Sequence, residues 1–404
     1  MKRLNKNVMI FIITFSIIIA GLFSSGFLKG ICGSFKELTN FFLLDGSVEA
    51  FNSFTTSIET ASSQGLSYHK EFVDLNSAMQ KGMGTAVVYK DDMTVARSES
   101  GYLSYIRDKI PQETLENRAG NVAELYQAAE ENGAEFLYVM APAKGYNMEY
   151  PDNIVDYNKS NCDAFLEELK KKGVPYYNLI SQMEKEGISE EDMFFITDHH
   201  WKPEYALWSA NRVAEELDSR FGFKYDKEKL NIKNYNEEVY EDWFLGSQGK
   251  KTGQYFTPLG LDDISIFTPK FETSFVNTIV GKDYSVQGTF KDVLIHKEHI
   301  EEKDLYNKNP YATYLGGDYR EQVIENTKNK NGKKVLILKD SFSCAFAPFF
   351  STVTKDTYLL DMRDYAEFAG DRIDVAEYIE KTKPDIVLVM YTGVTGTDVL
   401  YEFK

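Results

Sequence analysis

Short apolar runs that alternate with helical patterns constrain the fold of this chain more than any other feature of its sequence. Two helical patterns end near Gly133 and Gly173, and a run rich in branched and aromatic residues follows each of them. Alternation of this kind is typical of strands that pair in parallel. The sequence therefore predicts an α/β fold with a parallel sheet. Its expected strands lie at residues 135–140, 174–179, 334–338, 357–361 and 385–390.

The alternation is interrupted between residues 219 and 333. This segment is rich in glycine, asparagine, lysine and aromatic residues, and it contains strand-like pieces at 264–267 and 274–276. A hairpin pattern at 86–95 precedes the first helix. We therefore expect one sheet, built from both halves of the chain and interrupted by a β-rich insertion.

The N-terminus predicts a membrane segment. Lys2, Arg3 and Lys6 precede a stretch from Val8 to Phe23 that carries no charge and continues as apolar sequence to Leu28. The positive flank places the N-terminus inside and the bulk of the chain outside the cell membrane. We predict a single-pass signal anchor at 1–30, a stalk or lead-in at 31–83 and an extracytoplasmic domain at 84–404, with a cleaved signal peptide and secretion as the alternative.

Charge and cysteine content exclude several classes of protein. The net charge of the 404-residue chain is −17, which excludes nucleic acid as an expected partner. Its three cysteines are widely spaced, which argues against a disulfide framework or a zinc site. We expect neither a metal nor a cofactor, and we expect Cys344 to be a buried small residue.

The heptapeptide Thr-Asp-His-His-Trp-Lys-Pro at 197–203 is the strongest candidate for chemistry. Pro203 suits the first position of a helix, and an apolar helical pattern follows it. Asp198 and His200 therefore lie on a loop that enters a helix. Ser341 follows the expected strand at 334–338, where an open α/β sheet places its ligands. A serine needs a histidine to take its proton, and the histidine needs an acid to orient it.

Each of these residues also has a simpler interpretation. Asp198 could cap the helix that follows it, and His200 could be a hydrogen-bonded structural residue. Asp198, His199 and His200 together could instead bind a metal, although His296 and His299 lack a helical ligand spacing with them. The combination with a serine after a resumed strand favours a catalytic triad of Asp198, His200 and Ser341.

Other residues are weaker candidates for substrate binding or oxyanion stabilisation. Lys144 follows a strand and could meet an anionic sugar or an oxyanion, or could be a surface lysine. Trp201 could be a sugar platform or a packing residue, and Arg363 could pair with Asp361 or Asp364. The loop from Gly246 to Gly253 could contact a glycan or form a hairpin. The candidates in this group are Lys144, His199, Trp201, Gly317 and Arg363.

The motif resembles a known family. Asp-His-His-Trp at 198–201 is the signature of the DHHW protein family, which is similar to the alginate O-acetyltransferases of the AlgJ and AlgX type. The segments that resemble its other blocks are Gly316–Asp318, Lys339–Phe342, Pro348–Phe349 and Asp361–Tyr365. The resemblance covers about residues 84 to 395. It implies an SGNH hydrolase-like, flavodoxin-like three-layer sandwich, permuted so that Asp198 and His200 precede Ser341.

The resemblance also implies a function. We expect a serine O-acyltransferase or esterase that acts on a cell-envelope polysaccharide through an acyl-serine at Ser341, with Asp198 orienting His200 as the base. A separate membrane protein would supply the acyl group, since the sequence shows no acyl-CoA motif. The alternative is a non-catalytic glycan-binding or scaffold protein of exopolysaccharide assembly on the same fold.

Overall fold

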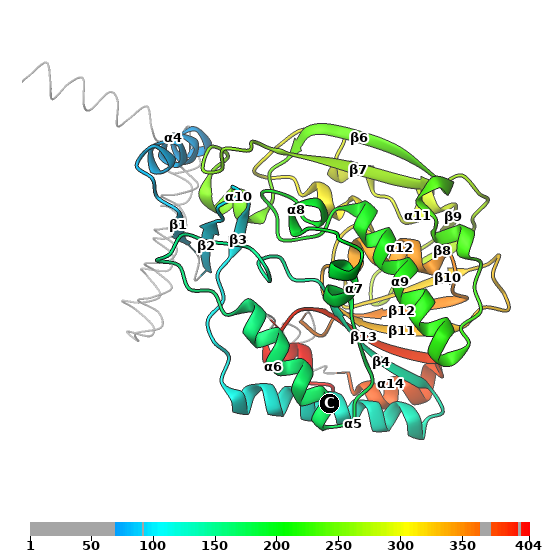
Figure 1. Cartoon of the computed structure of the whole chain (residues 1–404). Helices are drawn as coiled ribbons and strands as arrows, with labels where there is room; N and C mark the ends of the chain where they lie inside the picture. Colours follow the sequence, from blue (N-terminus) through cyan, green and yellow to red (C-terminus); the bar gives the residue numbers. More distant parts are fainter. Residues whose placement is uncertain (1–68, 91–92, 364–372, 395–396) are drawn as a thin grey trace, which may run out of the picture. The chain divides into compact units, whose positions relative to one another are not determined.

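The computed structural model describes residues 69–90, 93–363, 373–394 and 397–404 (Figure 1). The chain divides into two compact units, residues 1–80 and 81–404. Most of helix α4 (His69–Gly82) belongs to the first unit, so the final part of the predicted stalk is helical. The rest of that segment, from residue 31 to residue 68, lies outside the described residues.

The predicted membrane localisation is corrected by the structure. Across the residues that are described, every helix is too short or too polar to cross a bilayer. The expected single-pass anchor at 1–30, on which the prediction depended, lies outside the described residues.

An eight-stranded sheet forms the centre of the second unit. Five neighbouring strands pair in parallel, and three further strands extend the sheet in antiparallel pairing. In spatial order they are β5 (Tyr176–Asn178), β4 (Glu135–Ala141), β13 (Ile386–Thr392), β11 (Lys334–Lys339), β12 (Asp356–Leu360), β10 (Glu321–Asn326), β8 (Phe275–Ile279) and β9 (Tyr284–Gly288). The predicted α/β class with a mostly parallel sheet is therefore confirmed.

The middle strands are apolar because helices cover both faces of the sheet. Leu338 of β11 pairs with Val389 of β13 on one side and with Leu360 of β12 on the other, and all three are fully buried. A strand buried on both faces needs apolar side chains at every position rather than at alternate ones. This explains the continuous apolar runs in the sequence.

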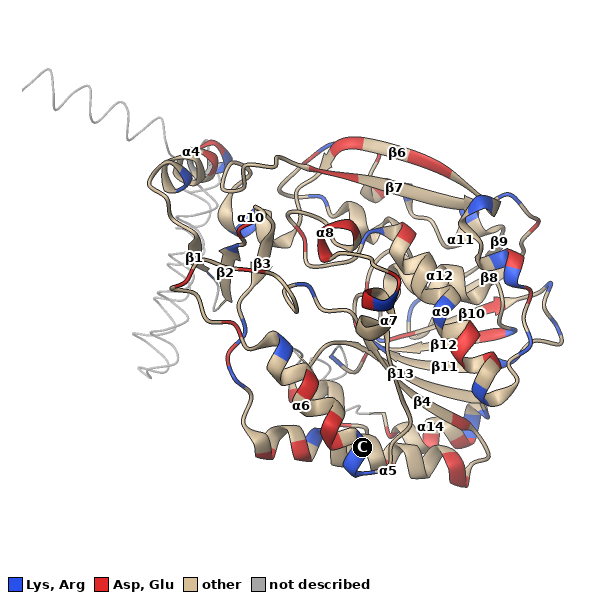
Figure 2. Cartoon of the chain, in the orientation of Figure 1, with Lys and Arg blue, Asp and Glu red and all other residues tan. Residues whose placement is uncertain are grey.

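The helices form two layers around the sheet. Figure 1 shows α5 and α14 below the parallel strands and α9 and α12 above them. Acidic residues lie on outward-facing elements such as β6 and α5 (Figure 2). The longer helices are α5 (Gln112–Glu131), α6 (Asn158–Lys171), α9 (Pro203–Phe221), α12 (Ser343–Ser351) and α14 (Val375–Thr382), and α7 (Leu179–Lys185) and α8 (Glu190–Met193) are short.

The segment 219–333 is integrated into the fold rather than set apart from it. Its strands β8, β9 and β10 join the edge of the central sheet, while β6 (Tyr235–Phe244) and β7 (Asp262–Pro269) pair separately. A third sheet contains the predicted hairpin. Its strands are β1 (Val87–Lys90), β2 (Met93–Arg97) and β3 (Leu103–Tyr105).

The same segment also carries most of the short helical turns. The remaining elements are α10 (Ser247–Thr252), α11 (Phe290–Val293) and the 3-10 turns η2 (Lys227–Leu230), η3 (Ile232–Asn234), η4 (Lys297–His299), η5 (Pro310–Thr313) and η6 (Asp398–Tyr401). Two of these, α10 and η5, reach the candidate site described next.

Candidate active site

The loop between α8 and α9 carries the Asp-His-His-Trp motif. A bridge between Phe194 and Trp201 closes this loop at its base. Lys202 is the residue before α9, and Pro203 occupies the first turn of the helix. Asp198 therefore does not cap α9, which leaves its carboxylate available for the histidine.

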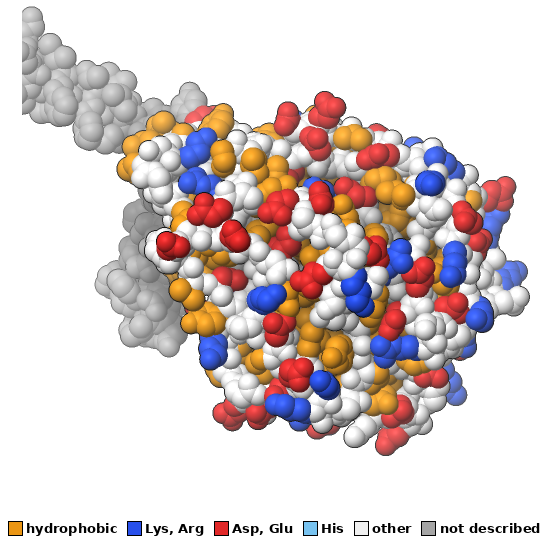
Figure 3. Space-filling view, in the orientation of Figure 1, with side chains coloured by type: hydrophobic (Ala, Val, Ile, Leu, Met, Phe, Trp, Pro, Cys, Tyr) orange, Lys and Arg blue, Asp and Glu red, His pale blue; other side chains and the backbone are white. Residues whose placement is uncertain are grey.

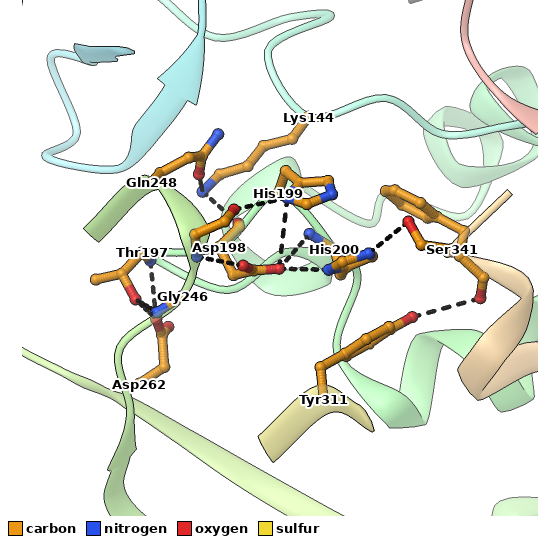
Figure 4. Close-up of polar contacts among 12 residues, drawn as sticks. Lys144, Thr197, Asp198, His199, His200, Gly246, Gln248, Asp262, Tyr311 and Ser341 are labelled. Atoms are coloured by element: carbon orange, nitrogen blue, oxygen red, sulfur yellow. Dashed lines mark hydrogen bonds and ion pairs between the residues drawn. The ribbon is translucent and has the colours of Figure 1, made fainter. Parts of the chain in front are cut away.

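Asp198, His200 and Ser341 form a continuous chain of hydrogen bonds (Figure 4). The Nδ1 of His200 lies 2.5 Å from Oδ1 of Asp198. Its Nε2 lies 2.8 Å from Oγ of Ser341, a residue 141 positions later in the sequence. Because a carboxylate accepts the proton of Nδ1, Nε2 is free to accept a proton from the serine hydroxyl.

The carboxylate of Asp198 is almost fully buried and accepts several hydrogen bonds. Oδ1 also accepts the backbone amide of His200 at 3.0 Å, and Oδ2 accepts the amide of Ser247 at 2.6 Å. Burial by itself would raise the pKa of Asp198, but His200, His199 and these hydrogen bonds hold the pKa well below its usual value. Asp198 is therefore ionised throughout the neutral pH range.

Two rings hold the imidazole of His200 in place. Tyr311, on η5, stacks on one side with its centroid 4.0 Å away and an interplanar angle of 12°. The ring of His199 lies 3.9 Å away at 37°. Burial lowers the pKa of His199 to about 3, with His200 as the next cause, so His199 is neutral. Its Nδ1 bonds to Ser247 Oγ at 2.9 Å.

Ser341 lies at the carboxyl end of β11, in the turn before α12. Asp340 anchors this turn: its Oδ1 accepts the amide of Phe342 at 3.0 Å, and its Oδ2 accepts the amide of Thr392 at 2.7 Å. Since Thr392 ends β13, this carboxylate ties the serine turn to the neighbouring strand. The position of Ser341 is therefore set by the rigid sheet.

Two buried charges clamp the loop that carries Asp198. The ammonium of Lys144 donates to the carbonyl oxygens of Ile196 at 3.0 Å and Asp198 at 2.8 Å. The carboxylate of Asp262 accepts the amides of Ile196 and Thr197 and the hydroxyl of Thr197. Burial lowers the pKa of Lys144 and raises that of Asp262, and the opposite charges partly offset both effects.

Glu190, at the start of α8, anchors the turn that follows Lys144. Its two carboxylate oxygens accept the amides of Gly145 at 2.8 Å and Asn147 at 2.6 Å. Burial raises the pKa of Glu190 to about 7, although both hydrogen bonds oppose this shift. The loop after β4 is thus attached to the helix that precedes the motif.

A cavity opens beside Ser341. Its walls come from β2 and β3, the loop after β4, α10, the turn after β11 and the chain after β13. The polar side chains that line it are Arg107, Lys144, Asn158, His199, Gln248, Asp340, Ser341, Arg363, Thr392 and Thr397. The nucleophile candidate therefore faces a space that a substrate can enter.

A buried ionic network lies at the end of β11. Lys339 is fully buried and contacts Asp318 at 2.5 Å and Asp361 at 3.4 Å. Arg363 binds Asp361 with two nitrogens, at 3.0 and 2.5 Å, and Asp318 at 3.3 Å. Burial by itself would lower the pKa of Lys339, but Asp318 and the other acidic partners raise it. Arg363 is therefore an ion-pair residue that also lines the cavity.

The structure decides between the alternative interpretations of several weaker candidates. Trp201 is fully buried against Phe342, so its ring cannot stack on a sugar. The ammonium of Lys144 is already bound by the carbonyl oxygens of Ile196 and Asp198 and by Oε1 of Gln248. Gly317 is not among the residues that line the cavity, and its carbonyl accepts the thiol of buried Cys344 at 3.5 Å. It therefore offers no oxyanion donor there.

The loop from Gly246 to Gly253 is helical and not a hairpin. It forms α10, whose first amide binds Asp198, while the amide of Gly249 donates to Thr197 at 2.9 Å. Trp243 donates through Nε1 to the carbonyl of Ile300 at 2.8 Å. This stretch therefore packs against the motif loop and holds it by hydrogen bonds.

The alternative metal site can also be placed. One ligand atom from each of Asp198, His199 and His200 lies within 4.8 Å of the others. However, both nitrogens of His200 bind protein groups, and Nδ1 of His199 binds Ser247. An ion would have to break these bonds, so the arrangement suits proton transfer better than metal coordination.

Sequence reasoning missed Gln248, Tyr311, Asp262 and Arg107. All four contact or approach the motif from distant parts of the chain, and none lies in a recognisable pattern. The glycines at 246 and 249 were the only local signal. They are required because a side chain at either position would collide with Asp198 or with Leu245 and Thr197.

Comparisons with known proteins agree with this fold. Residues 102–242 match the family model of the SGNH hydrolase-like domain of the acetyltransferase AlgX. No curated protein sequence matched the chain. PatB1 from Bacillus cereus is 24% identical, with a TM-score of 0.62 over 79% of this chain and 99% of its own. The structure of PatB1 with a sulfonyl adduct is 23% identical, with a TM-score of 0.63 over 78% and 100%.

A DHHW family protein from Eubacterium siraeum is 18% identical, with a TM-score of 0.58 over 78% of this chain and 96% of its own. At these identities the likeness to solved structures establishes the fold. The predicted resemblance and the SGNH hydrolase-like fold are therefore confirmed.

Proposed function

We propose that this protein is a serine O-acyltransferase or esterase that uses Ser341 as nucleophile, His200 as general base and Asp198 as the residue that orients the imidazole. One observation carries the proposal. The hydrogen bonds from Ser341 through His200 to Asp198 join residues from two separate segments, and Ser341 lines a cavity. This arrangement meets the geometric requirement for an activated serine.

The reaction would proceed through an acyl-serine. His200 Nε2 takes the proton of Ser341 Oγ as the oxygen attacks the ester carbonyl of the donor. When the tetrahedral intermediate collapses, the imidazolium returns this proton to the leaving alcohol. An acceptor hydroxyl then gives its proton to Nε2 and attacks the acyl-serine. When this second intermediate collapses, the acyl–Oγ bond breaks, the imidazolium returns the proton to Ser341 Oγ, and the new ester is released.

The amide of Ser341 is the oxyanion donor that we propose. The amides of Phe342 and Ser343 already donate to Asp340, one to its side chain and one to its carbonyl. Backbone donors at the site of negative charge lower the barrier most when they are fixed in advance, and the Asp340 anchor fixes this turn.

We further propose that the acceptor is a polysaccharide and that a separate protein supplies the acyl group. The match of residues 102–242 to the AlgX acetyltransferase domain supports acyl transfer, and the polysaccharide and the separate donor are what the family resemblance of the motif implies. With water as acceptor, the same site would act as an esterase. Transfer requires that the sugar hydroxyl displaces water from the acyl-serine.

Labelling with an aryl sulfonyl fluoride tests the proposal directly, since this reagent sulfonylates an activated serine. A sulfonyl adduct is present in one solved structure of PatB1 from Bacillus cereus. We expect one label on the intact protein, at Ser341, and we expect Ser341→Ala to lose both the label and the hydrolysis of 4-nitrophenyl acetate.

Ser343→Ala is the matched control, because Ser343 lies two residues away, is buried, and its hydroxyl has no hydrogen-bond partner within the described part of the chain. It should keep both the label and the activity. Wild-type ester hydrolysis in folded Ser341→Ala would disprove the nucleophile assignment and favour a non-catalytic glycan-binding protein.

A further inference from the structure

Strand β6 has a free edge. In the described part of the chain it pairs with β7 alone, and Figure 1 shows it on the outer side of that pair. The amide of Phe267 donates to the hydroxyl of Tyr314 at 2.9 Å, and the carbonyl of Ser265 accepts this hydroxyl at 3.0 Å. Phe267 and Ser265, both on β7, therefore point these backbone groups away from β6.

The residues of β6 that lie opposite them point their own backbone groups to the free edge. Glu237 lies opposite Phe267, and Val239 lies opposite Ser265. In an antiparallel pair, two opposed residues either exchange both hydrogen bonds or both point away from each other. The N–H and C=O groups of Glu237 and Val239 therefore face outwards, and Val239 is 51% exposed. A row of such groups is a template for a further strand.

The strand is acidic along its length. It contains neither lysine nor arginine and carries the acidic residues Glu237, Glu238, Glu241 and Asp242. Lys297 pairs with Glu238, and no cation among the described residues contacts the other three. Acidic side chains gather at the top of the view in Figure 3, where Figure 1 places β6. Pairing of two copies through this edge would bring like charges together, so the strand suits a basic partner.

An acidic cavity adjoins the same strand. One lysine, Lys202, lines it, and its ammonium donates to the carbonyl oxygens of Glu191 at 3.2 Å and Asp192 at 2.8 Å. Burial raises the pKa of Glu204 in this cavity, and the negative charge of Glu237 adds to the effect. A cationic side chain of a partner would therefore meet opposite charge there. The acidic residues that line the cavity are Glu204, Asp242, Asp262 and Asp263.

This cavity is separate from the one that contains Ser341, since the two share no lining residue in the described structure. Asp262 connects it to the motif loop, because its carboxylate accepts the amides of Ile196 and Thr197. The strand β6 itself ends two residues before Gly246, whose amide donates to Thr197 Oγ1 at 2.8 Å. A partner on β6 would thus bind next to the elements that hold the motif loop and leave the cavity beside Ser341 open.

We propose that β6 and the adjoining acidic cavity form a docking site for another protein, which adds an extended segment rich in lysine or arginine as a third strand. The backbone groups of Glu237 and Val239 bind the main chain of this segment. Its basic side chains pair with Glu237 and Glu241, and one of them enters the cavity. The inference does not depend on the chemistry proposed for Ser341.

Two matched peptides test the docking site. The probes are Lys-Val-Lys-Val-Lys-Val-Lys with blocked ends and the same peptide with glutamate in place of every lysine. Calorimetry should give the lysine peptide a dissociation constant roughly tenfold or more below that of the glutamate peptide, because several ion pairs replace repulsions. Hydrogen exchange followed by mass spectrometry should become slower over residues 235–241 with the lysine peptide, since a third strand covers the amides of Glu237 and Val239. Attraction by charge alone would leave this exchange unchanged.

Two double variants assign the binding to this strand. Glu237→Gln combined with Glu241→Gln removes two exposed charges from β6 and should weaken binding of the lysine peptide roughly fivefold. Glu113→Gln combined with Glu131→Gln removes the same charge from exposed positions on α5 and should leave the affinity unchanged. Thermal melting verifies that both variants are folded.

Several results would overturn the inference. They are no binding of the lysine peptide at millimolar concentration, equal affinity for the two peptides, binding without slower exchange over residues 235–241, and undiminished affinity in the β6 double variant. Protection of residues 235–241 that rises with protein concentration in the absence of peptide would identify a second copy of this chain as the occupant, and would also overturn it. None of these results depends on catalysis or on the labelling of Ser341.

Discussion

Gly246 packs directly against Asp198, which leaves no room for a side chain between α10 and the motif loop. A methyl group built on Gly246 would lie 2.1 Å from Cβ and 2.5 Å from Cα of Asp198. The amide of Gly246 donates to Thr197 Oγ1 at 2.8 Å, and the next amide, that of Ser247, binds the Asp198 carboxylate. A segment with no motif of its own therefore sets the position of the catalytic acid that we propose.

Gly246→Ala should inactivate the enzyme without unfolding it. The added methyl group must push Asp198 away from His200, and a displacement of about 1 Å at a catalytic group costs roughly 100-fold in rate. The measurement is kcat/KM for 4-nitrophenyl acetate. Gly82→Ala is the control, since nothing lies within 4 Å of the added carbon there. Activity within threefold of wild type would contradict the proposed role of this contact.

Asp198→Asn should reduce kcat by roughly 10⁴-fold, as expected when a histidine is held in the wrong tautomer. Oδ1 of Asp198 accepts two N–H groups of His200, and Oδ2 accepts the amide of Ser247. An amide NH₂ group at either position would face another donor. Kinetics on the purified variant, with circular dichroism to verify folding, provide the measurement. A loss of less than tenfold would show that Asp198 does not orient the base.

Lys144→Met should lower both stability and activity. It removes the buried ammonium that binds Ile196, Asp198 and Gln248, and with it the positive charge that opposes the effect of burial on the pKa of Asp262. Breaking a buried charge pair costs about 3 kcal/mol or more in the free energy of unfolding. Urea denaturation measures this cost.

The matched control for that variant is Lys159→Met. Lys159 is exposed, and among the described residues its ammonium contacts Asn147 Oδ1 at 2.9 Å and the Tyr146 ring at 4.2 Å. We expect a change below about 1 kcal/mol there. Equal destabilisation by the two substitutions would argue against a role of Lys144 in holding the motif loop.

Glu190 should make the protein less stable as the pH rises from about 4.5 to 7. Burial raises its pKa from 4.5 in the unfolded chain to about 7 in the folded protein. The folded state therefore binds the proton more tightly, and this stabilisation is complete below pH 4.5 and lost as the pH passes 7. The shift corresponds to about 3 kcal/mol.

Unfolding of wild type and Glu190→Gln at several pH values isolates this effect. The amide does not titrate, so the stability of wild type relative to the variant should fall by about 3 kcal/mol between pH 4.5 and 8. The absolute difference also contains a constant cost, because one of the two backbone amides bound by Glu190 loses its acceptor. A difference that does not vary with pH would refute the assignment.

The sequence by itself determined the parallel strands and the three residues proposed as the triad. Strands buried on both faces need continuous apolar runs. The sequences of β4, β11 and β13 contain such runs. The acid and the base lie two positions apart, and the serine follows a recognisable strand end. Local patterns of this kind can be recognised in the sequence without knowledge of the fold.

Only the tertiary structure decided what surrounds those three residues. Gly246, Gln248 and Tyr311 come from the segment between the two halves of the sheet, and their contacts with the motif cross gaps of many positions. Lys144 follows a strand end, as expected for a site residue, yet its ammonium binds carbonyl oxygens of the motif loop. The direction of a side chain and its burial depend on what packs against it, and that information is spread over the whole chain.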